Sequence, residues 1–157
     1  MSKFIMFVGL PGAGKSTKAL EFEQLGYKIY SPDKIRNELN MHETEQIQEV
    51  LDILHSRMKK DLELGNDIIY DSTNLTKQRR RKVLNELKLY NYEKECYVFI
   101  VPLSVCKDRN SKRVGYSKVS DRDYNIMTNC FTIPMSDEGF DKIIYDIQDD
   151  KIIVKEE

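Results

Sequence analysis

The sequence has little of what would divide it into modules, cross-link it or hold it in a membrane. Its 157 residues include three cysteines, four prolines and seven glycines, with no low-complexity tract or internal repeat. An odd number of cysteines without C-x-x-C spacing supports neither a disulfide framework nor a zinc site. No apolar run is long enough for a membrane span or a signal-peptide core. We therefore expect one soluble, cytoplasmic domain over residues 1–157, without a membrane partner.

The net charge of −1 conceals an uneven distribution along the chain. Between Lys77 and Arg122, thirteen basic residues stand against five acidic ones, whereas residues 137–157 hold three basic and eight acidic residues. A basic middle beside an acidic end indicates a polyanionic ligand that approaches one face, although such runs also solvate exposed helices. Because the overall charge is so small, we expect no extensive footprint on a nucleic-acid duplex.

A glycine-rich segment with the spacing G-x-x-x-x-G-K-[ST] follows an apolar run near the N-terminus. Its glycines allow consecutive backbone N–H groups to surround an anion at a helix N-terminus. We expect Lys15 to reach the β- and γ-phosphates of ATP and the Ser16 hydroxyl to bind Mg²⁺. A chance match is the alternative, but the position between a predicted strand and a predicted helix favours a phosphate-binding loop, the P-loop. Its predicted phosphate-binding residues are Gly9, Pro11, Gly12, Ala13, Gly14, Lys15, Ser16 and Thr17.

Strand and helix patterns alternate along the chain. Short apolar runs predict strands at residues 4–8, 27–30, 68–70 and 96–101, and a terminal strand pair at residues 140–147 and 151–154. Predicted helices cover residues 16–25, 34–40, 44–64, 76–90, 104–112 and 121–130. We expect Asp33 to be the N-cap of the second helix. The alternation predicts an α/β fold, with a parallel sheet flanked by helices on both faces.

Two aspartates directly follow predicted strands, where the reacting groups of parallel sheets gather. Asp33 follows the strand at residues 27–30, and Asp71 follows the strand at residues 68–70. A carboxylate beside a triphosphate can hold Mg²⁺ or accept a proton from a hydroxyl that attacks the γ-phosphorus. Helix capping by Asp33 and an Asx turn at Asp71 are the structural alternatives.

A polar, glycine-containing segment at residues 115–118 predicts a mobile loop within a lid over about residues 109–122. Arg109 and Arg113 are four residues apart, so on a helix they would share one face and could both meet the ATP phosphates. Ordinary solvated helix positions are the alternative for both arginines.

Four segments then follow one another in a recognisable order. They are residues 9–17, Ser31-Pro32-Asp33-Lys34-Ile35-Arg36, Asp71-Ser72-Thr73-Asn74-Leu75 with Arg79-Arg80, and Arg109-Asn110-Ser111-Lys112-Arg113. Together they resemble the kinase domain of phage-type 5′-hydroxyl polynucleotide kinases. The resemblance implies a P-loop kinase fold that transfers the γ-phosphoryl group of ATP to the 5′-hydroxyl of DNA or RNA. Best-known members of that family add a phosphatase domain, which we do not expect in this chain.

The same resemblance implies roles for individual residues. Asp33 would be the general base, Arg36 would hold the 3′-phosphate of the acceptor, and Arg113 would contact the donor phosphates. The resemblance also extends to a group of acceptor-site residues, namely Asp71, Thr73 and Asn74. The family places its acid directly before Thr-Asn, where this sequence has Ser72, and a shift of one residue at a strand end can turn a side chain to the other face.

Three classes of function follow from these patterns. A polynucleotide 5′-kinase leads, with ATP and Mg²⁺ as cofactors, single-stranded 5′ ends as partners, and a separate ligase or phosphatase as a further possible partner. The alternative is a P-loop kinase for a nucleoside or another small hydroxyl-bearing substrate, which suits the modest net charge. An NTP-driven switch is the third class, but the sequence has no Asn-Lys-x-Asp guanine motif.

Overall fold

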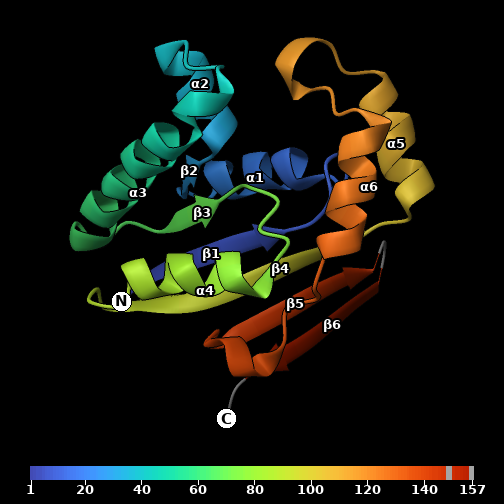
Figure 1. Ribbon diagram of the computed structural model, residues 1–157. Coiled ribbons are helices and arrows are strands. Elements are labelled where there is room, and N and C mark those ends of the chain that lie inside the picture. The colour runs from blue at the N-terminus through green and yellow to red at the C-terminus, as the bar shows by residue number, and fades with distance from the viewer. Residues whose placement is uncertain (148–149, 156–157) are drawn as a thin grey trace.

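A six-stranded sheet forms the centre of the protein (Figure 1). The computed structural model describes residues 1–147 and 150–155, and orders the strands β2-β3-β1-β4-β5-β6. The strands are β1 (Ser2–Val8), β2 (Lys28–Tyr30), β3 (Ile68–Tyr70), β4 (Tyr92–Ile100), β5 (Lys142–Ile147) and β6 (Asp150–Lys155). Strands β1 to β5 run parallel, and β6 pairs antiparallel with β5. The predicted parallel sheet and terminal strand pair are confirmed, while residues 148–149 between the paired strands lie outside the described residues.

Alternate residues of β1 contribute to two separate cores, as the two-residue period of a strand requires. Phe4, Met6 and Val8 pack into a first core, and Ile5 and Phe7 pack into a second. Each fully buried side chain of this size contributes about 1.5–3 kcal/mol relative to an exposed one. The sheet therefore carries an apolar layer on both of its faces, which accounts for the near-continuous apolar run in this strand.

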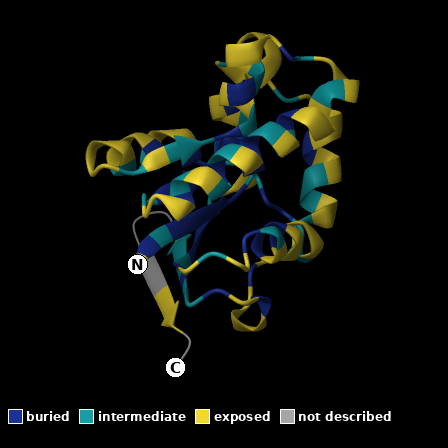
Figure 2. Cartoon of the chain, turned by 90° about the vertical axis from the view of Figure 1, so that its left-hand side faces the viewer, coloured by how far each residue is buried: buried dark blue, intermediate teal, exposed yellow. Residues whose placement is uncertain are grey.

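Helices cover both apolar layers of the sheet. Packing against the first core are α2 (Pro32–Leu39), α3 (Ile47–Glu63) and α4 (Lys77–Glu86). Packing against the second core are α1 (Lys15–Gln24), α5 (Leu103–Ser111) and α6 (Asp121–Cys130). Figure 2 shows the buried residues along the strands and the exposed ones on the outer sides of the helices. Within the described residues, no helix combines the length and apolar character needed to cross a membrane.

The start of α2 corrects one prediction. Ser31, not Asp33, is the N-cap, because its Oγ accepts a hydrogen bond from the backbone N–H of Lys34 at 3.1 Å. Pro32 then occupies the first helical position, where its missing N–H costs nothing. As a result, the Asp33 carboxylate is not used for capping and remains exposed in the first turn.

Other element boundaries differ from the predictions by a few residues. The predicted helix over residues 44–64 begins with a 3-10 turn at Thr44–Gln46 before α3 starts. The predicted helix over residues 76–90 ends earlier, because α4 stops at Glu86. Strand β4 is longer than predicted at its start, where it pairs with β1 from the first residue of each strand. These differences lie at element ends, where local patterns carry the least information.

The parallel strands bring three loops to one edge of the sheet. Strand β3 lies between β1 and β2, with Tyr70 paired to Met6 on one side and to Tyr30 on the other. The loops that leave these strands therefore start side by side, and helices α5 and α6 rise beside them (Figure 1). This edge is where parallel α/β sheets bind their ligands.

Candidate active site

A cleft of about 510 Å³ lies at the carboxyl ends of the central strands. It is lined by the P-loop, the first turns of α2, the loop after β3 and the loop between α5 and α6. Predicted site residues in the lining are Pro11, Gly12, Lys15, Ser16, Thr17, Asp33, Asp71, Thr73 and Arg113. The structure therefore gathers in one cavity side chains that the sequence supplies from four separate segments.

The P-loop turns at positions that only glycine can occupy without strain. Gly12 and Gly14 have φ angles of 82° and 98°, in the left-handed region. A Cβ atom on Gly12 would lie 2.4 Å from the carbonyl oxygen of Cys106 in α5, so a side chain at this position would clash. Gly14 directly precedes α1, and the helix N-terminus therefore opens toward the loop. This is the arrangement that binds a phosphate group through backbone N–H groups.

Lys15 is buried in the P-loop and is bonded to it. Its ammonium donates hydrogen bonds to the carbonyl oxygens of Gly9 at 3.0 Å and Leu10 at 2.7 Å. Burial lowers the pKa of Lys15 to about 8, an effect that Asp71 opposes and Arg113 reinforces. A bound phosphate would supply the negative charge that this buried cation lacks.

Ser16 and Asp71 place two oxygen ligands beside Lys15. The Ser16 hydroxyl donates a hydrogen bond to Oδ2 of Asp71 at 3.1 Å. Burial raises the pKa of the Asp71 carboxyl, although Lys15 and the hydrogen bond from Ser16 oppose the shift. A hydroxyl and a carboxylate are ligands that suit Mg²⁺. No group of three or more His, Cys, Asp or Glu residues forms a metal site within the described chain, so an ion here would depend on phosphate and water for its other ligands.

Arg109 lies behind the P-loop rather than in the cleft. Its Nη1 donates a hydrogen bond to the carbonyl oxygen of Gly12 at 3.1 Å, and its side chain lines a separate cavity of about 680 Å³ together with Gly14 and Thr17. Arg113 lies beyond the end of α5, so the two arginines do not share a helix face as predicted. The structure places them on different sides of the same loop.

Tyr124 of α6 joins the P-loop to the base of the predicted lid. Its hydroxyl lies 2.7 Å from the carbonyl oxygen of Pro11 and 3.3 Å from that of Cys106. The ring is fully buried in the second core. Helices α5 and α6 are therefore fixed to the phosphate-binding loop, and only the segment between them extends away from it.

Asn110 closes the loop that carries Arg113 into the cleft. Its side chain accepts a hydrogen bond from the Val119 N–H at 2.8 Å and donates one to the Val119 carbonyl at 2.7 Å. At the tip of this loop, the Tyr116 ring stacks on His42 with a centroid distance of 3.9 Å. Residues 111–118 are thus held at their base and contact the connection between α2 and α3.

The predicted acceptor residues do not all reach the cleft. Asp33 lines it from the first turn of α2, and Asn37 lines it one turn later, whereas half-buried Arg36 does not line it. Thr73 lines the cleft as well, and its carbonyl accepts a hydrogen bond from the Gly9 N–H at 3.1 Å. Asn74 is fully buried, and its amide donates to the Phe7 carbonyl at 2.8 Å. Its position fits a role in holding the loop rather than in touching a ligand.

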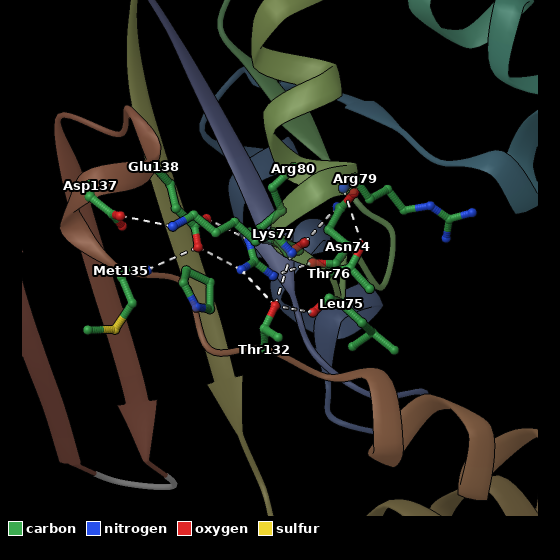
Figure 3. Close-up of polar contacts among 12 residues, drawn as sticks. Asn74, Leu75, Thr76, Lys77, Arg79, Arg80, Thr132, Met135, Asp137 and Glu138 are labelled. Carbon is green, nitrogen blue, oxygen red and sulfur yellow. Dashed lines mark hydrogen bonds and ion pairs between the residues drawn. The ribbon is translucent and has the colours of Figure 1, made fainter.

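A buried ion pair supports the loop after β3 (Figure 3). Nε and Nη2 of Arg80 donate to the two carboxylate oxygens of Glu138 at 2.7 Å each, and both side chains are buried. Arg80 also donates to the Asn74 carbonyl at 3.0 Å and to the Thr132 hydroxyl at 3.3 Å. These bonds offset the desolvation of the two charges, and removing one partner of such a pair typically costs about 3–5 kcal/mol. The network fixes the shape of the loop that presents Asp71 and Thr73.

Several of these supporting residues were not identified from the sequence. Arg80 entered only as part of a resemblance, and Tyr124, Asn110 and Glu138 were not singled out as site residues. Each acts through a partner that is distant in the sequence or lies across a loop. What marks these residues is a polar side chain at a buried position, and burial cannot be read from a single sequence.

This fold and this cleft define a P-loop nucleotide-binding protein, because a glycine-rich loop leaves a central parallel strand, opens an α-helix and buries a lysine. A family model described as "AAA domain" matches residues 4–134, and the chain belongs to this family of P-loop kinases.

Named relatives are similar to this chain over most of its length. A protein of Acanthamoeba polyphaga mimivirus, whose assigned name is that of a bifunctional polynucleotide phosphatase/kinase, is 29% identical over 149 residues. The match covers 90% of this chain but 32% of the mimivirus protein. This chain therefore spans about a third of the length of that relative.

Two solved structures share the fold. A chain of the Pnkp1/Rnl/Hen1 complex matches with a TM-score of 0.61 and 21% identity, over 76% of this chain and 42% of that one. A sugar kinase from Janibacter sp. HTCC2649 matches with a TM-score of 0.68 and 18% identity, over 92% of this chain and 86% of that one. At such identities the structures show the P-loop kinase fold alone.

Proposed function

We propose that this protein transfers the γ-phosphoryl group of ATP to the 5′-hydroxyl of a DNA or RNA strand. The observation that carries the proposal is that an exposed carboxylate, Asp33, shares one cleft with Lys15, Ser16 and Arg113. A switch protein would not need a proton acceptor in this place, whereas a kinase does. The name of the mimivirus relative supports a polynucleotide as the acceptor.

Each residue of the cleft has a role in this reaction. Lys15 and the P-loop N–H groups hold the donor phosphates, and Arg113 adds positive charge from the lid loop. When Mg²⁺ is bound, Ser16 and Asp71 would hold it, and it would neutralise phosphate charge. Asp33 accepts the proton of the 5′-hydroxyl while the oxygen of that hydroxyl bonds to the γ-phosphorus. The bond between the γ-phosphorus and the oxygen that bridges it to the β-phosphorus breaks, and ADP leaves.

The nucleoside of ATP belongs, in this proposal, in the cavity behind the P-loop. Gly14 and Thr17 line that cavity at the start of α1, and Arg109 lines it from α5. Arg109 can meet the phosphates from this side while Arg113 meets them from the cleft. In this proposal both predicted phosphate-binding arginines still contact the ATP phosphates, one from each side of the P-loop.

The acceptor would enter between α2 and the loop after β3. Asp71 and Thr73 line the cleft there, with Asn74 holding the loop beneath them. Arg36 is proposed to bind the phosphate on the 3′ side of the reacting nucleoside, which requires its side chain to turn toward the cleft. In the present arrangement Asn37 lines the cleft and Arg36 does not.

Acceptor kinetics test this assignment. Wild-type protein should phosphorylate a nucleoside 3′-monophosphate well and the matching nucleoside poorly. Arg36→Ala should erase this preference through kcat/KM while leaving ATP affinity unchanged, and Glu38→Ala, on the same helix but outside the lining of the cleft, is the control. Equal use of both acceptors by the wild-type protein would overturn the polynucleotide assignment.

A kinase for a small hydroxyl-bearing substrate is the second candidate. The sugar kinase from Janibacter sp. HTCC2649 favours it, because that fold match covers 92% of this chain. Nucleosides and sugars belong in the same acceptor panel, and transfer to one of them without transfer to nucleotides would establish this candidate. A separate ligase or phosphatase partner is proposed only together with the polynucleotide assignment, and the match to a chain of the Pnkp1/Rnl/Hen1 complex is consistent with a protein that assembles with others.

A further inference from the structure

A second basic surface lies away from the cleft. A groove of about 680 Å³ runs between the outer side of α4 and the start of β4, and none of the residues lining the cleft takes part in it. Its lining includes four basic side chains, which are Arg81, Lys82, Lys88 and Lys94. The cleft lies at the carboxyl ends of the parallel strands. The groove lies beside the first residues of β4, which are at the other end of the strand (Figure 1).

The positive charge of this groove is largely uncompensated. Arg81, Lys82 and Lys88 are exposed and form no ion pair with any residue that the structure describes. The acid in the lining, Glu138, already bonds to Arg80. Lys94 has only a long contact, with its ammonium 3.9 Å from a carboxylate oxygen of Asp141. Arg81 is near enough to Asp137 to help lower the pKa of that carboxyl, but Asp137 already pairs with Lys77, so an anion that entered the groove would still meet cations without a close ion pair.

Two tyrosines stand among these cations. Tyr90 and Tyr92 both line the groove, and the ammonium of Lys94 lies 5.4 Å from the centroid of the Tyr92 ring. The Tyr92 hydroxyl is buried and has no hydrogen-bond partner in the described part of the chain. A solvated helix face requires neither a hollow nor aromatic residues in it. Tyr92 packs in the first core and is 5% exposed, so half-buried Tyr90 is the ring that could meet a base, and it stands beside the cations of the groove as in sites that bind single-stranded nucleic acid.

Helix α4 connects the groove to the cleft. Its N-cap, Thr76, follows directly on the loop that presents Asp71 and Thr73, and its last residues lie beside the groove. Ten helical residues span about 15 Å. A strand with its 5′ end in the cleft therefore has only a short distance to cover along this helix, which exposes Arg81 on the side of the groove and Arg79 on the other side.

We propose that this groove binds the phosphodiester backbone of a single-stranded nucleic acid a few nucleotides beyond its reactive 5′ end. The inference rests on the proposed polynucleotide function and adds a second contact area to it. The groove would then lower KM for long acceptors without affecting an acceptor that consists of one nucleotide.

Charge reversal in the groove tests the proposal. The variant is the double substitution Arg81→Glu with Lys88→Glu, and its control is Lys28→Glu with Lys60→Glu, which makes the same charge change at exposed lysines of β2 and α3. The acceptors are a nucleoside 3′-monophosphate and a single strand of about 12 nucleotides, within the usual site size of single-strand binding proteins. Equal thermal unfolding midpoints show that both variants remain folded.

The groove variant should lose about tenfold or more in kcat/KM for the long acceptor and nothing for the mononucleotide. For the long acceptor, the slope of log kcat/KM against log salt concentration should become shallower by about one to two units, because each contact with a single-strand phosphate contributes about 0.7 to that slope. The control should resemble wild type with both acceptors. If wild type is active on both acceptors and the groove variant has the same kinetics and salt dependence as wild type, the proposal that the groove binds nucleic acid is overturned. The proposed function would remain intact.

If wild type phosphorylates neither acceptor, a direct binding measurement tests the groove separately from the proposed kinase function. The proposed function then fails, and fluorescence anisotropy with a labelled, 5′-phosphorylated 12-nucleotide strand measures the groove on its own. Weaker binding by the groove variant than by the control supports the groove, and equal binding overturns it. Polyglutamate that displaces the strand from wild type at equal charge concentration would reassign the groove to an acidic protein and also overturn the proposal.

Discussion

The two sides of the cleft differ in how firmly they are held. On the donor side, Arg109 bonds to Gly12 and Tyr124 contacts the Pro11 carbonyl, so that the P-loop is fixed from behind. On the acceptor side, Asp33 is exposed on an eight-residue helix. The P-loop side is thus built before a ligand arrives. On the opposite side, the loop after β3 is anchored by Arg80 and Glu138, whereas α2 keeps side chains that are open to solvent.

This difference explains what the similar proteins share. Phosphate binding depends on a short loop whose geometry is fixed, and the same loop can serve kinases with unrelated acceptors. In the proposed function, the acceptor would be selected by α2, by the loop after β3 and by the predicted lid loop, where exposed residues can change at little cost to stability. Fold matches to both a chain of the Pnkp1/Rnl/Hen1 complex and a sugar kinase are therefore expected of one fold.

Removing the donor-side cation should have the largest effect. Lys15→Ala should lower kcat by about 10²–10³-fold, because it deletes a preorganised charge that acts on the transferred phosphoryl group. The fold should survive, since Lys15 contacts the loop rather than an apolar core, and thermal unfolding measures this. Turnover within about tenfold of wild type would show that Lys15 is not the phosphate clamp.

A substitution at Asp33 should lower transfer without lowering nucleotide affinity. Asp33→Asn keeps the shape of the side chain but cannot take a proton, so transfer should fall by about 10²-fold while ATP binding is preserved. Single-turnover transfer and a separate measurement of the dissociation constant for ATP distinguish the two effects. If neither quantity changes, Asp33 has a structural role and the contrast between the two sides does not extend to catalysis.

The smallest effect is a pH dependence of nucleotide affinity. The free protein has a Lys15 pKa of about 8, and bound phosphate raises it because the opposite charge favours the ammonium form. The complex then holds more protons than the free protein above about pH 8, so affinity should fall as the pH rises, by at most tenfold per unit. Below that pKa this lysine should contribute no pH dependence.

Titration calorimetry with ADP between about pH 7 and pH 9.5 measures this slope, since that range brackets the shifted pKa. Lys15→Arg is the matched control, because a guanidinium stays charged throughout and should give a flat profile. A flat profile for wild type would mean that Lys15 does not change its protonation when nucleotide binds.

The sequence predicted best what depends on neighbouring residues. The P-loop is a contiguous motif, and its strand and helix follow from apolar period and glycine positions, so Lys15 and Ser16 were placed correctly in the fold. The N-cap of α2 shows the limit of this reasoning. Ser31 and Asp33 are both good capping residues, and the fixed φ and missing N–H of Pro32 decide in favour of Ser31.

Contacts between distant segments could not be predicted in the same way. No local pattern pairs Tyr124 with Pro11, which lie 113 positions apart, or shows that Arg113 would leave α5 and separate from Arg109. The side chain of Arg36 illustrates the same limit, because the resemblance assigned it to the acceptor site while in the folded protein Asn37 lines the cleft instead. Such details depend on packing, which acts across the whole chain.

The buried pair of Arg80 and Glu138 has a consequence for the order in which the protein forms. These residues lie 58 positions apart, and a chain emerges from the ribosome with its N-terminus first. The P-loop and its central strands are therefore complete long before Glu138 appears. A nascent chain that stopped short of Glu138 would carry the whole phosphate-binding loop but would lack the anchor for the loop that presents Asp71. The loop that presents Asp71 and Thr73 is therefore the part of the cleft that gains its support last.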